Sequence, residues 1–251
     1  IASTILLGPT IAGREPEVVA LFGLNSPVDG PFPSDVFTVR DDTQNSGLRV
    51  SLPKPDCQVY VSDCQDLDVI NELDGFNLQP RLSIPFSGPI DPRSVTSDAV
   101  FLVSLGSTVP GQSSTLWGTK VDIDQVVWDT FTNTLHVESD DLLDQHTRYV
   151  LVVTKHLRNE NDKAIKPARE FLRFADDDVA ESTCDPDRDA YRAVLRSALT
   201  ELDTHGIVPK GQVVAASVFT TQSATSILEK IRDQIHAATP DPADFLLGAS
   251  G

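Results

Sequence analysis

The stretch Thr147–Lys155, TRYVLVVTK, carries the strongest β-strand pattern in this sequence. Side chains on a strand alternate between its two faces, because the side-chain period is two residues. Here Tyr149, Leu151 and Val153 share one face, and Val150 and Val152 share the other. A β-strand is therefore expected at this position.

Other apolar stretches of strand length are separated by Pro, Gly, Asn and Asp residues that favour turns. In RLSIPF, Leu82, Ile84 and Phe86 alternate onto one face, and the prolines of the following SGPIDP fix φ in a turn. Further strands are expected at 36–39, 48–51, 81–86, 99–105, 125–129, 134–139, 170–175 and 213–220. This spacing is typical of an antiparallel β-sandwich, so the protein is expected to be mainly β.

Helical periodicity is strongest near the C-terminus. The helix expected over 187–204 begins at a capping Asp185 or Asp187 and ends at Gly206, as an excursion between the last two strands. Its predicted inward stripe is Ala190, Tyr191, Val194, Leu195, Ala198, Leu199 and Leu202. A second helix is expected in SATSILEKIRDQIHAAT, with Ile227, Leu228, Ile231 and Ile235 inward. A shorter helix is expected over 67–73, stopped by Asp74-Gly75.

The chain is strongly acidic. Its 37 acidic and 20 basic residues give a formal charge of −17 at pH 7. Phosphates of nucleic acids and anionic lipid headgroups would be repelled by such a surface, so neither is expected as a partner. A well-solvated surface of this kind suits a salty or extracellular medium. No run approaches the ~20 apolar residues of a membrane span, so none is expected.

Three cysteines stand at positions 57, 64 and 184. Cys57 and Cys64 lie seven residues apart in PDCQVYVSDCQ, which has the composition of a loop. This spacing favours a small disulfide in an exported protein, with free thiols as the alternative. It is a poor zinc site, because no second pair or histidine lies nearby. Cys184 is left either free or paired with something outside this chain.

The sequence offers no catalytic serine motif. A serine hydrolase of the α/β class needs G-x-S-x-G, because its nucleophile sits on a strained turn that requires glycines. Ser113 follows Gly111-Gln112, but Thr115 stands where the second glycine belongs. The related SLGST stretch lacks the first glycine. Ser113 is therefore interpreted as a loop serine, and no catalytic residue is expected.

No metal or cofactor site is expected either. The five histidines, at 136, 146, 156, 205 and 236, lack the i+2 or i+4 partners of a metal site and are interpreted as structural or surface residues. Asp185, Asp187 and Asp189 have the spacing that begins a calcium loop, but Ala190 and Arg196 occupy its glycine and glutamate positions. Helix capping explains these aspartates better. Dinucleotide and phosphate loops have no counterpart here.

Four phrases of the sequence resemble one protein family. They are PFPSDVFTV, GLRVSLPKPDC, INELDGFNLQPRLSIPFSGPIDP and the later VFTTQSAT. They are similar to the N-terminal domain of the bacterial virulence-factor-type extracellular lipases, over residues 31 to 243. LLDQHTRYVLVVTKHLRNENDKAI also resembles the closing strands of bacterial immunoglobulin-like modules, although Asn161-Asp162 stands where that turn often has glycine.

The residue pattern and the resemblance together indicate how the chain is organised. Prolines and turn formers predict an irregular segment over 1–80, packed on a β-sandwich over 81–222 that includes the helical excursion 187–204. The resemblance implies that this sandwich is immunoglobulin-like and that the helix and linker over 223–251 lead toward a hydrolase domain. Phe76, Leu82, Ile84 and Phe86 are expected in the core, with Pro85 and Pro89 setting the turn after them.

In that family an α/β-hydrolase domain follows and carries the serine, acid and histidine. No catalytic residue is carried over, because no position here matches one. The resemblance therefore implies a non-catalytic domain of a secreted or cell-surface bacterial lipase or carboxylesterase, which supports or shapes the catalytic domain. The alternative is a free-standing binding or adhesion module that uses an exposed aromatic such as Trp117. Trp128 is either a core residue or a surface aromatic that could stack on a sugar.

Overall fold

The computed structural model describes residues 17–109, 116–175 and 185–238. It is mainly β, with several antiparallel sheets and four α-helices in the described part of the chain. The central sheet has the strand order β11-β9-β5-β6, and every neighbouring pair in it is antiparallel. The strands are β11 (Val213–Thr220), β9 (Thr147–Thr154), β5 (Val100–Ser107) and β6 (Lys120–Val121).

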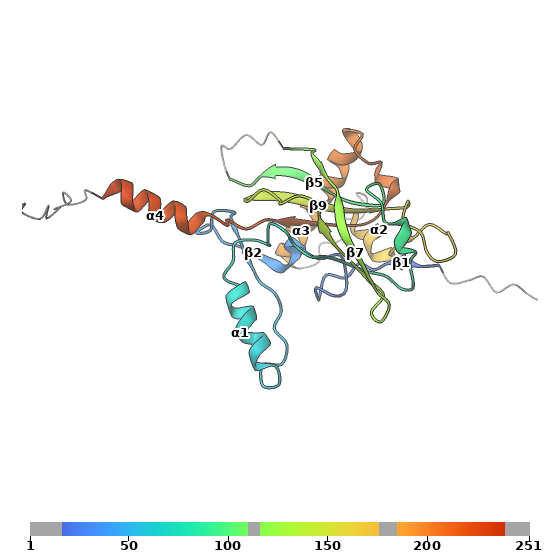
Figure 1. Ribbon diagram of the computed structural model, residues 1–251, viewed down its shortest axis with the longest axis horizontal. Coiled ribbons are helices and arrows are strands. Elements are labelled where there is room, and N and C mark those ends of the chain that lie inside the picture. The colour runs from blue at the N-terminus through green and yellow to red at the C-terminus, as the bar shows by residue number, and fades with distance from the viewer. Residues whose placement is uncertain (1–16, 110–115, 176–184, 239–251) are drawn as a thin grey trace, which may run out of the picture.

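A second antiparallel sheet, with the order β4-β8-β7, lies over one face of the central sheet (Figure 1). Its strands are β4 (Leu82–Pro85), β8 (Thr134–Ser139) and β7 (Ile123–Asp129). Its inward residues share one hydrophobic cluster with the Tyr149 face of β9. The predicted core residues Phe76, Leu82, Ile84 and Phe86 are all buried in this cluster, as expected.

The opposite face of the central sheet is covered by helices. Val150 and Val152 of β9 belong to a second hydrophobic cluster, which they share with α2 (Arg169–Ala175) and α3 (Pro186–Thr204). Asp185 caps α3 by accepting from the backbone N–H groups of Asp187 and Arg188. Gly206 ends it with φ +70°, the left-handed conformation that glycine adopts most easily. The predicted stripe of α3 is buried except for exposed Ala190 and half-buried Val194.

The strand predicted over 170–175 is wrong, because these residues form α2. EFLRFA alternates apolar and polar residues only in part, and Phe171, Phe174 and Ala175 have helical spacing. Both phenylalanines pack on Phe22, with ring centroids 5.2 and 5.3 Å away, while Leu172 is exposed. Tertiary packing against a residue far away in sequence thus selects the helix.

The remaining described elements are short. They are β1 (Val19–Ala20), which pairs in parallel with β10 (Lys166–Pro167), the antiparallel pair β2 (Thr38–Arg40) and β3 (Leu48–Val50), and the 3-10 turns η1 (Asp35–Phe37), η2 (Pro92–Ser94) and η3 (Lys210–Gln212). The strand expected over 36–39 is therefore β2, shifted toward the C-terminus because a 3-10 turn occupies its first residues. The helix expected over 67–73 is α1 (Val61–Ile70), which begins earlier and ends earlier.

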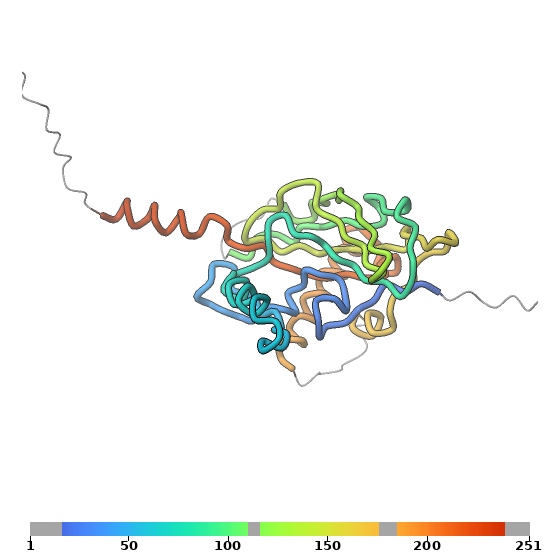
Figure 2. Tube along the Cα trace, turned by 60° about the horizontal axis from the view of Figure 1, so that its bottom comes forward, coloured from blue at the N-terminus to red at the C-terminus, as the bar shows by residue number. Residues whose placement is uncertain are grey.

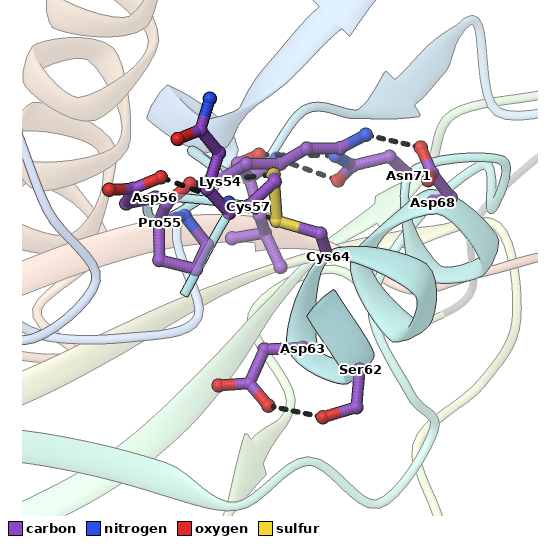
Figure 3. The surroundings of a disulfide bond; sticks show 11 residues. Lys54, Pro55, Asp56, Cys57, Ser62, Asp63, Cys64, Asp68 and Asn71 are labelled. Atoms are coloured by element: carbon purple, nitrogen blue, oxygen red, sulfur yellow. Dashed lines mark hydrogen bonds and ion pairs between the residues drawn. A yellow bond between two sulfur atoms is a disulfide. The ribbon is translucent and has the colours of Figure 1, made fainter. Parts of the chain in front are cut away.

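Helix α1 projects from the body of the protein (Figure 1). The predicted disulfide is present, and it joins Cys57 of the preceding loop to Cys64 of α1 (Figure 3). At the other end of the helix, the Asn71 side chain accepts from the Leu52 N–H at 2.7 Å and donates to the Leu52 carbonyl. Because Cys64 is the only buried residue of α1, these links rather than a core hold the helix in place.

Helix α4 (Ser226–Ala237) extends away from the body as well (Figure 2). The prediction that its apolar residues point inward is wrong. Ile227, Leu228, Ile231 and Ile235 are 47 to 71% exposed, and no residue of α4 is buried. An amphipathic pattern specifies that one helix face is apolar, but it does not specify which surface covers that face.

Replacing Phe86 by alanine is expected to lower the free energy of unfolding by ~3 kcal/mol or more, because it opens a cavity in the core. Phe86 is 2% exposed and its ring packs on Trp128. Phe131→Ala is the matched control, because Phe131 is 95% exposed on the β7–β8 turn and should have little effect. Urea denaturation measures both. Equal stability of the two variants would show that Phe86 is not a core residue.

Candidate functional site

Two serine–histidine pairs lie among the described residues. The Ser83 hydroxyl of β4 lies 2.9 Å from Nδ1 of His136 on the neighbouring strand β8, where the two residues are register partners. Burial lowers the pKa of His136, and the nearby Arg81 lowers it further. The carboxylate of Asp129 acts in the opposite direction and raises this pKa, but in the described structure no carboxylate hydrogen-bonds to His136 to complete a relay. This pair is therefore a cross-strand hydrogen bond.

The second pair includes an acid, but in the wrong order for catalysis. Ser223 Oγ lies 2.7 Å from Nδ1 of His146 and also contacts Asp74 Oδ2, and all three residues are buried. A serine nucleophile needs the histidine between itself and the acid, so that the imidazole can take its proton. Here the serine lies between them. Asp74 also accepts from the Ser223 backbone N–H at 2.7 Å, which fixes the segment leading into α4.

The other candidates from the sequence are structural or undescribed. Asp185 caps α3, and within residues 17–109, 116–175 and 185–238 no three His, Cys, Asp or Glu side chains gather to hold a metal. His205 is the C-cap residue of α3, where a positive charge is favoured by the helix dipole. Ser113 and Cys184 lie outside the described residues.

Asp35 and Tyr191 accept hydrogen bonds from backbone N–H groups at the outer edge of β11. The sequence placed Tyr191 on the buried face of α3 but indicated neither this role nor Asp35. The Val218 N–H donates to Tyr191 Oη at 3.3 Å, and the Thr220 N–H donates to Asp35 Oδ1 at 2.8 Å. Unpaired donors at a sheet edge otherwise invite pairing with another strand. Two side chains from distant segments therefore take the place of a missing strand.

Asp35 is unusually buried for a carboxylate. Its Oδ2 accepts from the Thr220 hydroxyl at 2.8 Å and lies 3.9 Å from Arg148 Nε. Burial raises the pKa of Asp35 to about 6, and it outweighs the opposing effects of Arg148 and of the Thr220 hydrogen bonds. Its only signal in the sequence is its position in the PFPSDVFTV phrase, which carries no chemistry by itself.

Gly75 lies where the LDGF segment packs against residues 220–222 of the VFTTQSAT segment. The Phe76 N–H donates to the Thr220 carbonyl, and the Gln222 N–H donates to the Phe76 carbonyl, both at 2.8 Å. A Cβ on Gly75 would lie 2.7 Å from three backbone atoms of residues 220–222. These two segments of the chain can therefore approach this closely only because residue 75 has no side chain.

The two tryptophans are both held against the protein. Trp117 is partly buried, its ring lies 4.4 Å from that of His205, and its Nε1 donates to Glu201 at 3.3 Å. Trp128 is partly buried and packs against the core cluster beside Phe86. Neither ring is an open platform for a sugar.

The most distinctive surface is the apolar face of α4. We define it as Ile227, Leu228, Ile231 and Ile235, which lie on one side of the helix at positions i, i+1, i+4 and i+8. Charged residues, including Lys230 and Asp233, lie on the other side. An exposed apolar patch of this kind is typical of interaction surfaces. None of the described helices is long and apolar enough to cross a membrane.

Comparisons with known proteins do not identify a family. No protein-family model matches the chain, and no curated protein matches it. Among solved structures, the S-layer protein rSbsC is 15% identical at a TM-score of 0.26, covering 42% of this chain and 14% of that one. The N-terminal part of the bacterial S-layer protein SbsC is 15% identical at a TM-score of 0.27, covering 44% and 26%. This chain spans about a quarter or less of those chains, and the similarity is too weak to assign a fold.

Replacing Asp35 by asparagine is expected to change how stability depends on pH. The folded-state pKa of about 6 lies above the ordinary value of 3.8, so the folded protein binds more protons than the unfolded one between about pH 4 and 6. The free energy of unfolding of the wild-type protein therefore loses a contribution on the order of 2 to 3 kcal/mol as pH rises through this window. In Asp35→Asn this loss should disappear.

Urea denaturation at several pH values measures this effect as the difference between the two proteins. Asp41→Asn serves as a control, because the pKa of half-buried Asp41 is lowered, not raised, by hydrogen bonds from Thr43. If the difference between wild type and Asp35→Asn is constant from pH 4 to 7, Asp35 does not titrate as proposed.

Gly75→Ala is expected to destabilise the protein by about 1 to 3 kcal/mol, because the added methyl group forces the backbone at residues 220–222 to move. Gly211→Ala is the control, since no atom lies within 4 Å of a Cβ built there. Thermal unfolding of both variants gives the comparison. Similar melting temperatures would mean that the close approach at Gly75 is not required.

Proposed function

We propose that this chain is the non-catalytic, immunoglobulin-like domain of a secreted bacterial lipase or carboxylesterase, and that it packs on the catalytic α/β-hydrolase domain through the apolar face of α4. The observation that carries the proposal is the exposure of Ile227, Leu228, Ile231 and Ile235 on a helix with no buried residue. The resemblance of the PFPSD, LDGF and VFTTQS phrases to that family supports the choice of partner.

The site chemistry supports a role other than catalysis. Among the described residues, the serine–histidine pairs either lack a relay acid or place the acid on the serine, so they do not generate a nucleophile. The chain is thus better suited to position another domain than to react with an ester. In this role, α4 would be an interface helix rather than a helix of the core.

Two features support export. The Cys57–Cys64 disulfide persists best in an oxidising compartment, because cytosolic thiols are kept reduced. The formal charge of −17 keeps the surface well hydrated in an extracellular medium. Trp117, the residue on which an adhesion module would depend, has both its ring and its N–H engaged within the protein.

The test is to express the complete product of the gene beside the 251-residue chain and to assay both with p-nitrophenyl butyrate. We expect turnover by the complete product and none by the 251-residue chain. A complete product without a hydrolase domain, or turnover by this chain alone, would overturn the proposal.

The interface is tested in the complete product with Ile231→Asp, which places a charge in the centre of the apolar face of α4. We expect faster proteolysis between the two domains and a lower melting temperature of the catalytic unit. Lys230→Asp, on the charged side of the same helix, should leave both unchanged. If Ile231→Asp behaves like Lys230→Asp, α4 is not the contact.

A further inference from the structure

Arg148 interrupts the apolar pattern on the helix-covered face of β9. It lies two residues before Val150 and therefore points to the same side of the sheet, toward α3. Its register partners are Gly106 on β5 and Thr220 on β11, so it stands in the interior of the sheet rather than at an edge. Its side chain is one third exposed, through the cavities described below.

The guanidinium of Arg148 lacks a hydrogen-bond acceptor among the described residues. Its Nε is buried and makes no hydrogen bond, because its ion-pair partner, Asp35 Oδ2, lies 3.9 Å away, which is too far for one. Both oxygens of Asp35 already accept from Thr220. A buried polar group that is left unsatisfied costs about 1 to 3 kcal/mol, and more when it is charged.

Two cavities meet at this residue. Each has a volume of about 330 Å³, and Arg148 and Val194 line both of them. Leu105 and Ala198 line the first cavity, which has Glu201 among its polar residues. Leu48 and Ala190 line the second, together with the acids Asp35, Asp42 and Asp187. The space around the guanidinium is thus apolar on several sides and bordered by acids.

We propose that Arg148 binds the carboxylate of a small monocarboxylate whose apolar part lies against Val194, Leu48 and Ala190. The planar fork of arginine matches a carboxylate with two parallel hydrogen bonds. A ligand of this kind would accept from the terminal Nη groups of Arg148, because Nε is buried and does not face the cavities. This inference is independent of the proposed function, because it requires neither α4 nor a second domain.

The surroundings favour a singly charged ligand over phosphate. The acids that line the two cavities would repel a doubly charged anion more strongly than a singly charged one, and they are Asp35, Asp42, Asp187 and Glu201. The overall charge of −17 weakens anion binding less than these neighbours do, because distant charges are screened beyond about 8 Å at physiological salt. Arg40 also lines the second cavity, but it is paired with Asp42 at 3.1 Å.

The interaction with Asp35 does not use the full hydrogen-bonding capacity of Arg148. Arg148 lowers the pKa of Asp35, although burial raises that pKa by more. An arginine placed only to neutralise an acid would form a bidentate pair with it, whereas here only one oxygen approaches, at 3.9 Å. The cation is therefore available to another acceptor.

The test is a titration of the 251-residue chain with sodium hexanoate, followed by protein NMR and isothermal calorimetry. We expect saturable binding, with shifts confined to the cavity-lining residues of β9, β5, α3 and the β2–β3 pair, and weakening as salt is raised. 1-Hexanol and inorganic phosphate are the matched probes, the first without the charge and the second without the apolar part. Both should bind at least tenfold more weakly than hexanoate.

Variants of the protein distinguish hexanoate binding at Arg148 from non-specific binding elsewhere. Arg148→Gln should weaken hexanoate binding at least tenfold, and Arg148→Lys should weaken it severalfold because the fork is lost. Arg93→Gln is the control, since Arg93 is 90% exposed and pairs with Asp91 away from the cavities. Val194→Phe should also block binding by filling the space, while Arg148 itself is retained.

Three results would overturn the proposal. They are absence of hexanoate binding by the wild-type chain, equal binding by folded Arg148→Gln or by Val194→Phe, and tighter binding of phosphate than of hexanoate. If Arg148→Gln does not fold, Val194→Phe decides alone. Each of these results leaves the α4 interface untouched, so the two proposals fail separately.

Discussion

The structure depends on one constraint: strand β9 is apolar on both faces. Leaving either face in water would cost ~1.5 to 3 kcal/mol for each large apolar side chain. The Tyr149 face is covered by the second sheet, and the Val150 face is covered by α2 and α3. The result is three layers, with β9 in the middle of the central one. Arg148 stands where the double-sided apolar pattern ends, and the packing opens into cavities at that point.

Much of this arrangement could be predicted from the sequence, because it follows from local patterns. The alternation in Thr147–Lys155 and in Arg81–Phe86 identified two strands and the core residues Leu82 and Ile84. Helix α3 could also be predicted, because its features depend on residues within a few positions of one another. These features are its buried stripe, its capping Asp185 and its terminating Gly206. The Cys57–Cys64 bond could be predicted for the same reason.

What the sequence did not reveal depends on distant contacts. EFLRFA forms a helix because Phe22 receives its phenylalanines, and Phe22 lies far away in the chain. Asp35 is buried because the β11 edge needs acceptors, a need that appears only once the strand order is known. The apolar residues of α4 are exposed although their periodicity predicts a buried face, because periodicity shows that one helix face is apolar without showing what packs on it. Arg148 is unusual only in the folded structure, where its buried Nε has no hydrogen-bond acceptor.

The way in which α4 leaves the body has a mechanical consequence. Figure 1 shows this helix continuing roughly along the direction of the strand that precedes it. A pull along the helix axis is therefore directed along β11, whose hydrogen bonds to β9 run perpendicular to the strands. Such a pull shears these bonds together instead of peeling them apart one by one. Asp74, bonded to Ser223 at the joint, anchors the same point to a second segment. A load applied at α4 is thus shared across the central sheet, which makes this end of the molecule stiff under tension.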